Sequence, residues 1–283
     1  MKSGSVLATL AIVGLVGREA AAYREREARR AANRAVRSEA AAGVGATRAP
    51  AGPHLAIVMA AYEEADGLTD VLAKIPPEII GLPVRIVVVD DGSTDRTAAI
   101  ASDSGADVAV HGRNLGQGDA LHTGFAVALD GGAEVVVTMD ADGQHRADQI
   151  EELVAPVVAG DADYVQGSRF LGLYDDAGTS RDAGIRVFTA LINAVGGTDI
   201  TDCTNGFRAI RGEGLARMRL HEDRFSAPEI ILEARRRGLR MLEVPVHIQS
   251  REHGESKKPR RLGYPLGFAR AIAEVRLRHA LGR

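Results

Sequence analysis

Apolar and polar residues alternate in two distinct ways downstream of His54. Short runs rich in Val, Ile and Ala predict β-strands, because strands that are covered on both faces are apolar throughout. These runs are residues 55–61, 84–90, 107–112, 133–140 and 161–167. Between them, apolar residues recur every three to four positions, which predicts helices at residues 67–75, 93–105, 118–132 and 147–160. The alternation predicts βαβ crossovers and an α/β fold: a Rossmann-like, mostly parallel central sheet with helices on both faces.

The pattern becomes less regular after Gly167. A polar connection as long as residues 168–184 is typical of a functional or mobile loop. Beyond it we expect a helix at 185–197, a strand at 206–210, a helix at 226–238, a strand at 239–248, a basic loop at 251–261 and a final basic helix.

The first 53 residues have a different character and form an N-terminal extension. Residues 5–17 are uncharged and mostly apolar, but a bilayer core needs about 20 residues of helix. A membrane-associated segment, a cleaved signal and a packed or disordered segment all remain open. Residues 18–42 are rich in Ala, Arg and Glu, which predicts a helix; without an apolar stripe, we expect it to be solvated or to lie against anionic lipid. Residues 43–53 predict a linker.

Composition narrows the function only a little. The chain has 283 residues, 45% of them hydrophobic and 26% charged, which is ordinary for a globular protein. A net charge of −3 gives no case for nucleic-acid binding, and the basic segment 234–240 is interpreted as a solvated face. The single cysteine, Cys203, excludes an intramolecular disulfide and a zinc cluster of cysteines; we interpret it as a packed residue.

Polar residues follow four successive predicted strands. The strands lead into AAYEEAD (60–66), DDGSTD (90–95), GRNLGQGDA (112–120) and DADGQH (140–145). The carboxyl ends of parallel strands meet at one edge of a sheet, where ligands of open α/β folds bind. We therefore expect these segments to form one site.

The DADGQH segment predicts a divalent-cation site. Asp140, Asp142 and Gln144 offer only oxygen ligands, which suit a hard cation such as Mg²⁺ or Mn²⁺. In an extended segment, residues two apart point to the same side, so all three would face one cation. Mg²⁺ prefers few carboxylates together with substrate phosphates, which indicates a di- or triphosphate ligand.

Eight ordered motifs between about Leu55 and Lys258 strengthen this interpretation: AAYEEADGL, VVVDDGSTDRT, NLGQGDAL, TMDADGQH, QGSRF, a downstream Arg, TDCTNGFRAI and HGESKK. In this order they resemble a family 2 glycosyltransferase of the GT-A fold, closest to the polyprenyl- and dolichyl-phosphate mannose or glucose synthase branch. The resemblance implies a UDP- or GDP-sugar donor and a Mg²⁺ or Mn²⁺ cofactor. It departs from the usual first motif at Ala60 and Glu63, which replace Pro and Asn.

The resemblance implies roles for individual residues on the donor side. Asp140 and Asp142 would hold the cation against the nucleotide-sugar diphosphate, with Gln144 as a further ligand. The nucleotide side would be formed by Ala60, Tyr62, Glu64, Asp90, Asp91, Gly116, Gln117 and Gly118.

On the acceptor side, the resemblance implies that Arg169 and Arg181 bind a polyprenyl phosphate and that Lys257 lies near the phosphates. Ile185 stands where the family often has Ser. A phosphate acceptor is already an anion and needs no strong base, whereas a sugar hydroxyl acceptor requires a carboxylate such as Asp223 or Glu229.

These features predict an inverting glycosyltransferase with a catalytic domain at residues 54–258, flanked by the extension 1–53 and a C-terminal basic helix at 259–283. We expect it at the cytoplasmic face of the cell membrane, without nucleic-acid partners. The alternatives are transfer to a sugar hydroxyl of a glycan, nucleotidyl transfer and a non-catalytic nucleotide-sugar-binding scaffold. Nucleotidyltransferases usually carry a Gly-rich, basic loop after the first strand. Here that position is the acidic segment AAYEEAD (60–66), and the first Gly follows only at Gly67, which argues against nucleotidyl transfer.

Overall fold

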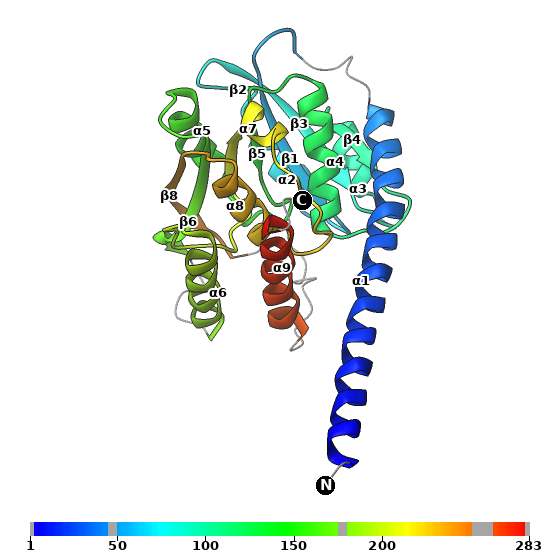
Figure 1. Ribbon diagram of the computed structural model, residues 1–283. Helices are drawn as coiled ribbons and strands as arrows, with labels where there is room; N and C mark the ends of the chain where they lie inside the picture. Colours follow the sequence, from blue (N-terminus) through cyan, green and yellow to red (C-terminus); the bar gives the residue numbers. More distant parts are fainter. Residues whose placement is uncertain (1–2, 45–49, 175–179, 251–262, 281–283) are drawn as a thin grey trace.

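A computed structural model describes residues 3–44, 50–174, 180–250 and 263–280, and it describes side chains within 24–44, 50–173, 182–250 and 267–280. Its centre is an eight-stranded sheet with the order β2-β3-β1-β5-β7-β6-β8, and β4 pairs with β3 (Figure 1). The strands are β1 (Leu55–Ala61), β2 (Glu78–Ile79), β3 (Leu82–Asp90), β4 (Asp107–Val110), β5 (Val135–Thr138), β6 (Tyr164–Tyr174), β7 (Arg208–Arg211) and β8 (Met241–Ile248). β1, β3, β4 and β5 pair in parallel, as do β6 and β8, whereas β7 is antiparallel to both of its neighbours.

Helices cover both faces of the sheet and bury a separate apolar cluster on each. One cluster joins the sheet to α2 (Leu68–Ala73), α3 (Thr97–Asp103) and α5 (Ile150–Val158). The other joins it to α4 (Gln117–Asp130), α6 (Ser180–Gly196), α8 (Ser226–Arg236) and α9 (Gly263–Ala280). The remaining helices are α1 (Ser3–Val44), η2 (Ala147–Gln149) and α7 (Gly212–Ala216). This is the predicted Rossmann-like α/β architecture.

Several element boundaries differ from the predictions. The segment 168–184 is not a loop throughout: β6 continues to Tyr174, where Leu173 and Tyr174 pair with β8, and α6 begins at Ser180. The helix expected at 93–105 begins only at Thr97, because Asp95 accepts hydrogen bonds from the Thr97 N–H and hydroxyl and holds the preceding residues in a turn. β2 and α7 were not predicted, and both are short. The basic loop expected at 251–261 lies outside the described residues.

The expectation that residues 18–42 form a solvated helix is wrong for the second half of that segment. α1 is one continuous helix, and its C-terminal half lies along α4 (Figure 1). Arg30 and Asn33 are buried there, and Ala40, Ala41 and Val44 pack against the second apolar cluster. The prediction failed because most of this contact is polar, so an apolar stripe was the wrong signal. In the described part of the chain, no helix has the length and hydropathy that a bilayer span needs.

Candidate functional site

Neighbouring strands bring the predicted motifs to one edge of the sheet. In the β1–β3 register, Ala61 lies opposite Asp90, so the residues that follow both strands emerge side by side. β5 pairs with the other side of β1 and ends at Thr138, which places Asp140 at the same edge. The sequence-predicted nucleotide and cation residues are therefore brought together.

Asp90 and Asp91 hold the turns of this edge. The Asp90 carboxylate accepts the Ser93 N–H (2.9 Å). Asp91 accepts the N–H groups of Leu115 (2.9 Å) and Gly116 (2.8 Å), and His111 Nδ1 donates to it (2.7 Å). Both aspartates are buried, so they shape the site from beneath.

Tyr62 and its neighbours form the rim above these aspartates. The Tyr62 side chain is 37% exposed, which leaves its ring accessible at the edge of the sheet. Glu63 has a φ of 55°, a conformation that Asn adopts more readily than Glu. The Glu63 N–H donates to Ser93 Oγ (2.9 Å), and its carboxylate accepts the Thr94 N–H (2.7 Å). These bonds account for how this chain tolerates Glu where the resembling family has Asn.

The acidic segment is a turn and not an extended strand, so the expected alternation of side chains does not apply. β5 ends at Thr138, and Gly143 has a φ of 76°, which reverses the chain between Asp142 and Gln144. Asp142 Oδ1 accepts the Gln144 N–H (3.1 Å) and stabilises this turn. Asp140, Asp142 and Gln144 are still held within one tight loop.

His145 supports the turn from below. Because the Asp140 N–H donates to His145 Nδ1 (3.0 Å), that nitrogen carries no proton. The proton is therefore on Nε2, which donates to Asn205 Oδ1 (3.0 Å). The ring stacks on Phe207 with a 4.8 Å centroid distance. Both ring nitrogens of His145 are thus engaged within the chain, and we interpret it as a positioning residue for the turn.

The donor set of the turn fits a divalent cation. Gln144 Nε2 donates to the Gln249 carbonyl (3.2 Å), which leaves the Oε1 atom of Gln144 available as an oxygen ligand. Asp140 is 27% exposed at its side chain, so its carboxylate is reachable from solvent. Among the described residues, no group of three His, Cys, Asp or Glu side chains forms a cage. Two carboxylates and an amide are the kind of incomplete set that Mg²⁺ fills with substrate phosphates.

The glycines of the 112–120 segment have a close neighbour within the chain itself. A Cβ atom at Gly118 would lie 2.0 Å from the Glu222 carbonyl oxygen, and one at Gly116 would lie 2.5 Å from that of Asp223. The Asp223 carbonyl accepts the Gly118 N–H (2.8 Å) at the start of α4. Gln117, between the two glycines, donates from Nε2 to Asp140 Oδ1 (3.2 Å). The absence of side chains at Gly116 and Gly118 therefore allows the backbone of residues 222–223 to pack closely against α4. Gln117 links α4 to the acidic turn through its hydrogen bond to Asp140.

Arg169 is buried, and among the three residues expected to bind the acceptor phosphate it is the one whose side chain falls within the described residues. Its Nε donates to Asp202 Oδ2 (2.6 Å), and its Nη2 donates to Thr204 (3.3 Å). Arg181 lies in α6, but its side chain is outside the described residues, as is the whole of Lys257.

Residues 202–206 connect Arg169 to the acidic turn, a role that sequence reasoning missed. Asp202 orients Arg169, and Asn205 orients His145. A Cβ atom at Gly206 would lie 3.0 Å from Asp140 Oδ1, so this glycine lets the backbone approach the carboxylate. The motif TDCTNG was visible in the sequence, but only the structure shows which side chains it holds.

Both candidate bases for a sugar hydroxyl have partners within the chain. Asp223 pairs with Arg29 (2.5 Å). Glu229 is fully buried, accepts the N–H groups of His221 and Glu222, and pairs with Arg278. Both carboxylates therefore hold the structure together.

Cys203 has the packed role that was expected of it. Its side chain is fully buried, and burial raises the pKa of the thiol to about 11. A thiol with that pKa carries almost no thiolate near neutral pH, which counts against a nucleophilic role.

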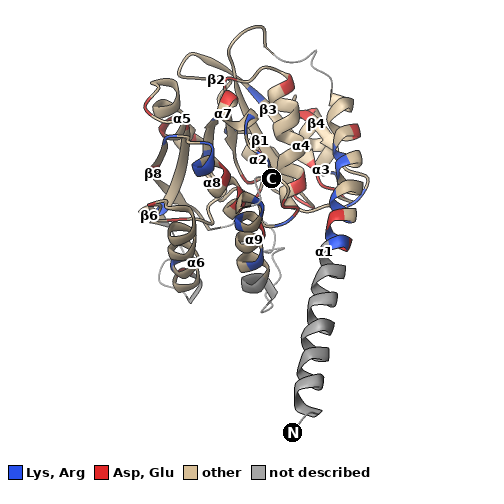
Figure 2. Cartoon of the chain, in the orientation of Figure 1, with Lys and Arg blue, Asp and Glu red and all other residues tan. Residues whose placement is uncertain are grey.

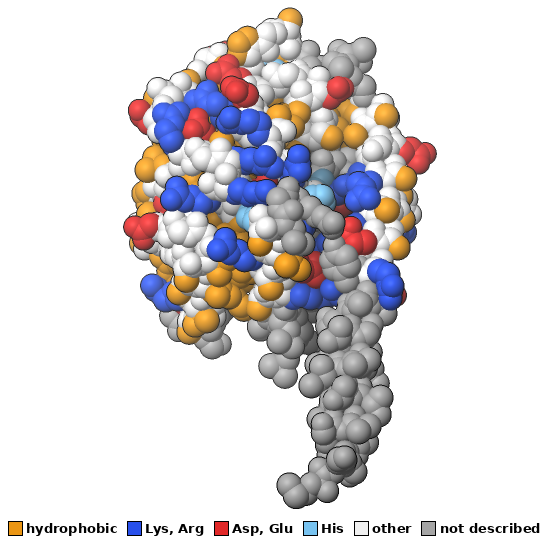
Figure 3. Space-filling model, viewed as in Figure 1, with side chains coloured by type: hydrophobic (Ala, Val, Ile, Leu, Met, Phe, Trp, Pro, Cys, Tyr) orange, Lys and Arg blue, Asp and Glu red, His pale blue; other side chains and the backbone are white. Residues whose placement is uncertain are grey.

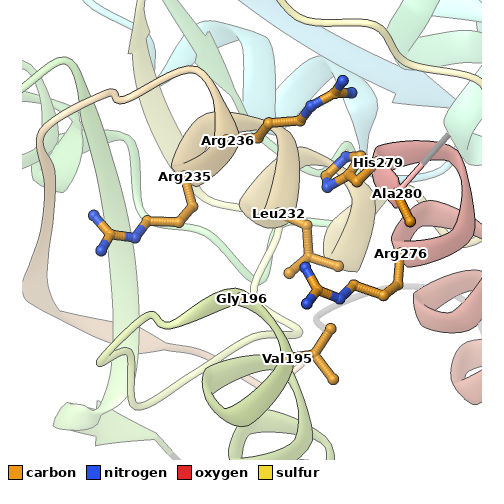
Figure 4. A pocket seen from close by; sticks show the side chains of 8 residues that line it. All are labelled: Val195, Gly196, Leu232, Arg235, Arg236, Arg276, His279 and Ala280. Atoms are coloured by element: carbon orange, nitrogen blue, oxygen red, sulfur yellow. The ribbon is translucent and has the colours of Figure 1, made fainter. Parts of the chain in front are cut away.

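Two cavities adjoin these elements. A cavity of about 410 Å³ lies beside the acidic turn and is lined by Met139, Gly143 and His145 together with Lys74 and Arg146. A cavity of about 590 Å³ lies at the C-terminal ends of α6, α8 and α9 (Figure 4). There the guanidinium groups of Arg235 and Arg236 point away from each other, so they do not converge on one ligand.

Lys and Arg side chains gather across the face of the molecule seen in Figure 3. In the basic segment 234–240, Arg235, Arg236 and Arg240 are exposed, as expected for a solvated face.

Comparison with known proteins agrees with the fold and the motifs. The undecaprenyl-phosphate mannosyltransferase of Micrococcus luteus is 35% identical over 183 residues, which cover 61% of this chain and 74% of that protein. The polyprenol monophosphomannose synthase of Mycolicibacterium smegmatis is 33% identical over 220 residues, covering 71% of this chain and 79% of that protein. Some relatives are longer, and the chain spans 64% and 62% of two of them.

A crystal structure of glucosyl-3-phosphoglycerate synthase from Mycobacterium tuberculosis, in complex with Mn²⁺, UDP and glucosyl-3-phosphoglycerate, shares the fold. It superposes with a TM-score of 0.62 at 22% identity, covering 79% of this chain and 78% of that one. The family model described as glycosyl transferase family 2 matches residues 56–218, more than half of the chain. The chain therefore belongs to glycosyl transferase family 2 and is a glycosyltransferase with a GT-A-like fold.

Proposed function

We propose that the protein is an inverting, divalent-metal-dependent glycosyltransferase that moves a hexose from a UDP- or GDP-sugar to a polyprenyl phosphate. The observation that carries the donor half is the oxygen set of Asp140, Asp142 and Gln144 at the sheet edge, next to the exposed ring of Tyr62. The observation that carries the acceptor half is the buried Arg169, oriented by Asp202.

On the donor side, Asp140, Asp142 and Gln144 would hold Mg²⁺ or Mn²⁺. The bound cation would supply positive charge to the diphosphate leaving group. The chain's own residues keep this set in place. His145 and Asn205 fix the Asp140 backbone, and Gln117 holds one oxygen of its carboxylate.

On the acceptor side, a lipid phosphate attacks the anomeric carbon from the face opposite the leaving group, which inverts its configuration. The phosphate is an anion near neutral pH, so charge neutralisation by guanidinium groups is required in place of a general base. Arg169 is held by Asp202 in a fixed orientation, and Arg181 and Lys257 are proposed to complete the phosphate site. The pairing of Asp223 and Glu229 within the structure favours this acceptor over a sugar hydroxyl.

The names of two relatives support this acceptor class, since one is an undecaprenyl-phosphate mannosyltransferase and the other a polyprenol monophosphomannose synthase. A polyprenyl phosphate resides in a membrane, so we also propose that the protein works at the cytoplasmic membrane surface.

The test is transfer from UDP- and GDP-hexoses to undecaprenyl or dolichyl phosphate with Mg²⁺ or Mn²⁺. The free polyprenol, which lacks the phosphate, is the matched acceptor control. We expect product only with the phosphate; equal transfer to the free alcohol would refute the acceptor assignment.

The metal assignment is tested separately with Asp142→Ala. We expect loss of both transfer and Mn²⁺-dependent nucleotide binding, whereas Asp161→Ala, which alters an exposed aspartate after α5, should behave like the wild type. Near-normal activity of the Asp142 variant would exclude it as a metal ligand.

A further inference from the structure

The polar face of α1 contacts the start of α4, which borders the candidate donor site. α1 itself lies outside the part of the chain that matches the family. Arg26, Arg30, Asn33 and Arg37 follow one another at intervals of four, three and four residues. This spacing places them on one side of a helix. Arg30 and Asn33 are 5% and 1% exposed, so this stripe faces the domain and not solvent.

Asp119, in the first turn of α4, is the centre of the contact. Asn33 donates to one of its carboxylate oxygens (2.5 Å), and Arg37 donates to the other (2.5 Å). Arg113, from the loop before α4, donates to Asn33 Oδ1 (2.9 Å). Basic positions of α1 thus lie beside acidic positions of the domain (Figure 2).

The charge of Asp119 is maintained despite its burial. Burial alone would raise the pKa of this carboxyl, but the hydrogen bond with His122 and the charge of Arg37 outweigh that effect and lower it. Removal of its α1 partners would leave a buried carboxylate poorly compensated, which is a strong reason for the surrounding backbone to move.

A second contact lies one turn earlier on α1. Arg29 pairs with Asp223 (2.5 Å), and Arg30 pairs with Glu222 (2.7 Å). The same 222–223 segment supplies the carbonyl that accepts N–H groups from Gly118 (2.8 Å) and Asp119 (3.2 Å). α1 therefore contacts the start of α4 directly through Asp119, and it contacts the same turn indirectly through residues 222–223.

The first turn of α4, which α1 contacts, also faces the loop that carries Asp140 and Asp142. Gln117 precedes Asp119 by two residues and donates to Asp140 Oδ1 (3.2 Å). A rotation or shift at the start of α4 would move Gln117 together with Asp119, because both belong to one rigid turn of helix. The path from α1 to the candidate cation ligand is thus Asn33 and Arg37, Asp119, Gln117 and Asp140.

We propose that Asn33 and Arg37 are positioning residues for the donor site, which hold α4 so that Gln117 orients Asp140 for the metal–nucleotide complex. This inference rests on the proposed function, since it assigns Asp140 to that complex. It gives the N-terminal helix a role in donor binding beyond adding stability.

The experiment compares variants of the full chain by titration calorimetry with Mn²⁺ plus UDP or GDP. For the double variant Asn33→Ala/Arg37→Ala we expect the Kd of the nucleotide to rise about 5- to 20-fold, the range for loss of one or two oriented polar contacts. The single variant Arg37→Lys keeps the positive charge, so its nucleotide Kd should lie between those of the wild type and the double variant.

Two controls separate positioning from general stabilisation. Arg34→Ala alters an exposed residue of the same helix and should change nothing. Arg26→Ala removes the ion pair with Glu274 of α9 (3.1 Å), which weakens the docking of α1 without touching Asp119. It should lower Tm but leave the nucleotide Kd unchanged.

The outcomes are distinguishable. If the wild type binds nucleotide with Mn²⁺ and Asp142→Ala does not, but the double variant binds like the wild type, only the positioning role is refuted. The same holds if Arg26→Ala weakens binding as much as the double variant does. If the wild type shows no Mn²⁺-dependent binding, the proposed function and this inference both fail.

Discussion

Replacement of Gly118 by Ala tests whether the glycines of the 112–120 segment serve the protein's own packing or the nucleotide. The new Cβ would lie 2.0 Å from the Glu222 carbonyl oxygen and 2.8 Å from the Asp223 carbonyl carbon. Both atoms belong to backbone, so the 222–223 segment would have to move away.

The cost follows from what that movement breaks. The Asp223 carbonyl would lose hydrogen bonds from Gly118 and Asp119, each contributing roughly 0.5–1.5 kcal/mol, and overpacking adds about 1–3 kcal/mol. We therefore expect the variant to lose about 2–6 kcal/mol of unfolding free energy. In a protein of 283 residues, Tm should then fall by roughly 3–10 °C.

The assay is thermal unfolding by circular dichroism without ligands, followed by nucleotide titration. Gly112→Ala is the matched control, because it lies in the same segment, has no atom within 4 Å of its would-be Cβ and has no positive φ. An unchanged Tm in Gly118→Ala, combined with weaker nucleotide binding, would refute the packing argument and favour close approach of the nucleotide.

Three further predictions concern buried groups. Burial raises the pKa of Glu222 to about 7, against the effect of Arg30, so the folded state retains a proton that the unfolded chain releases above about pH 4.5. The free energy of unfolding should fall by at most about 3 kcal/mol on this account as the pH rises from 4.5 to 7, and denaturant titrations of Glu222→Gln should show a smaller fall. The charged groups that face Glu222 are Arg30, Glu229, Glu274 and Arg278. Cys203 should resist thiol reagents at pH 8 until the protein unfolds, and rapid labelling of the native protein would contradict its burial. Asp202→Asn should raise the KM for the lipid phosphate more than the KM for the nucleotide sugar, because it frees Arg169; equal changes would count against an acceptor role.

Much of the fold was predictable because its strands are apolar on both faces. Residues 55–61 were predicted as a strand, and β1 spans the same residues. The acidic turn was less predictable, since only a backbone with Gly143 at positive φ shows that Asp140, Asp142 and Gln144 lie on a loop. The oxygen-bearing side chains identify these three residues as candidate ligands, whereas the expectation that they lie on an extended strand is wrong.

Contacts between distant parts of the chain were beyond the reach of local patterns. Nothing near Asp119 in the sequence reveals that Asn33 and Arg37 donate hydrogen bonds to its carboxylate, because these partners are more than 80 residues away. The same is true of Asp202 and Arg169, which the sequence presents as separate motifs. Polar interfaces carry no hydrophobic periodicity, so they are the part of a fold that such patterns miss.

The charge pairs of α1 have a consequence for any shortened form of the protein. A chain beginning at residue 54 would retain every strand of the sheet. It would, however, uncover the part of the second apolar cluster against which Ala40, Ala41 and Val44 pack, and it would leave Asp119, Glu222 and Asp223 without their arginines. Three carboxylates would then stand close together around the start of α4. We therefore expect the shortened chain to be less stable than the full chain, and we expect sequences that lose the helix to have replaced these acids as well.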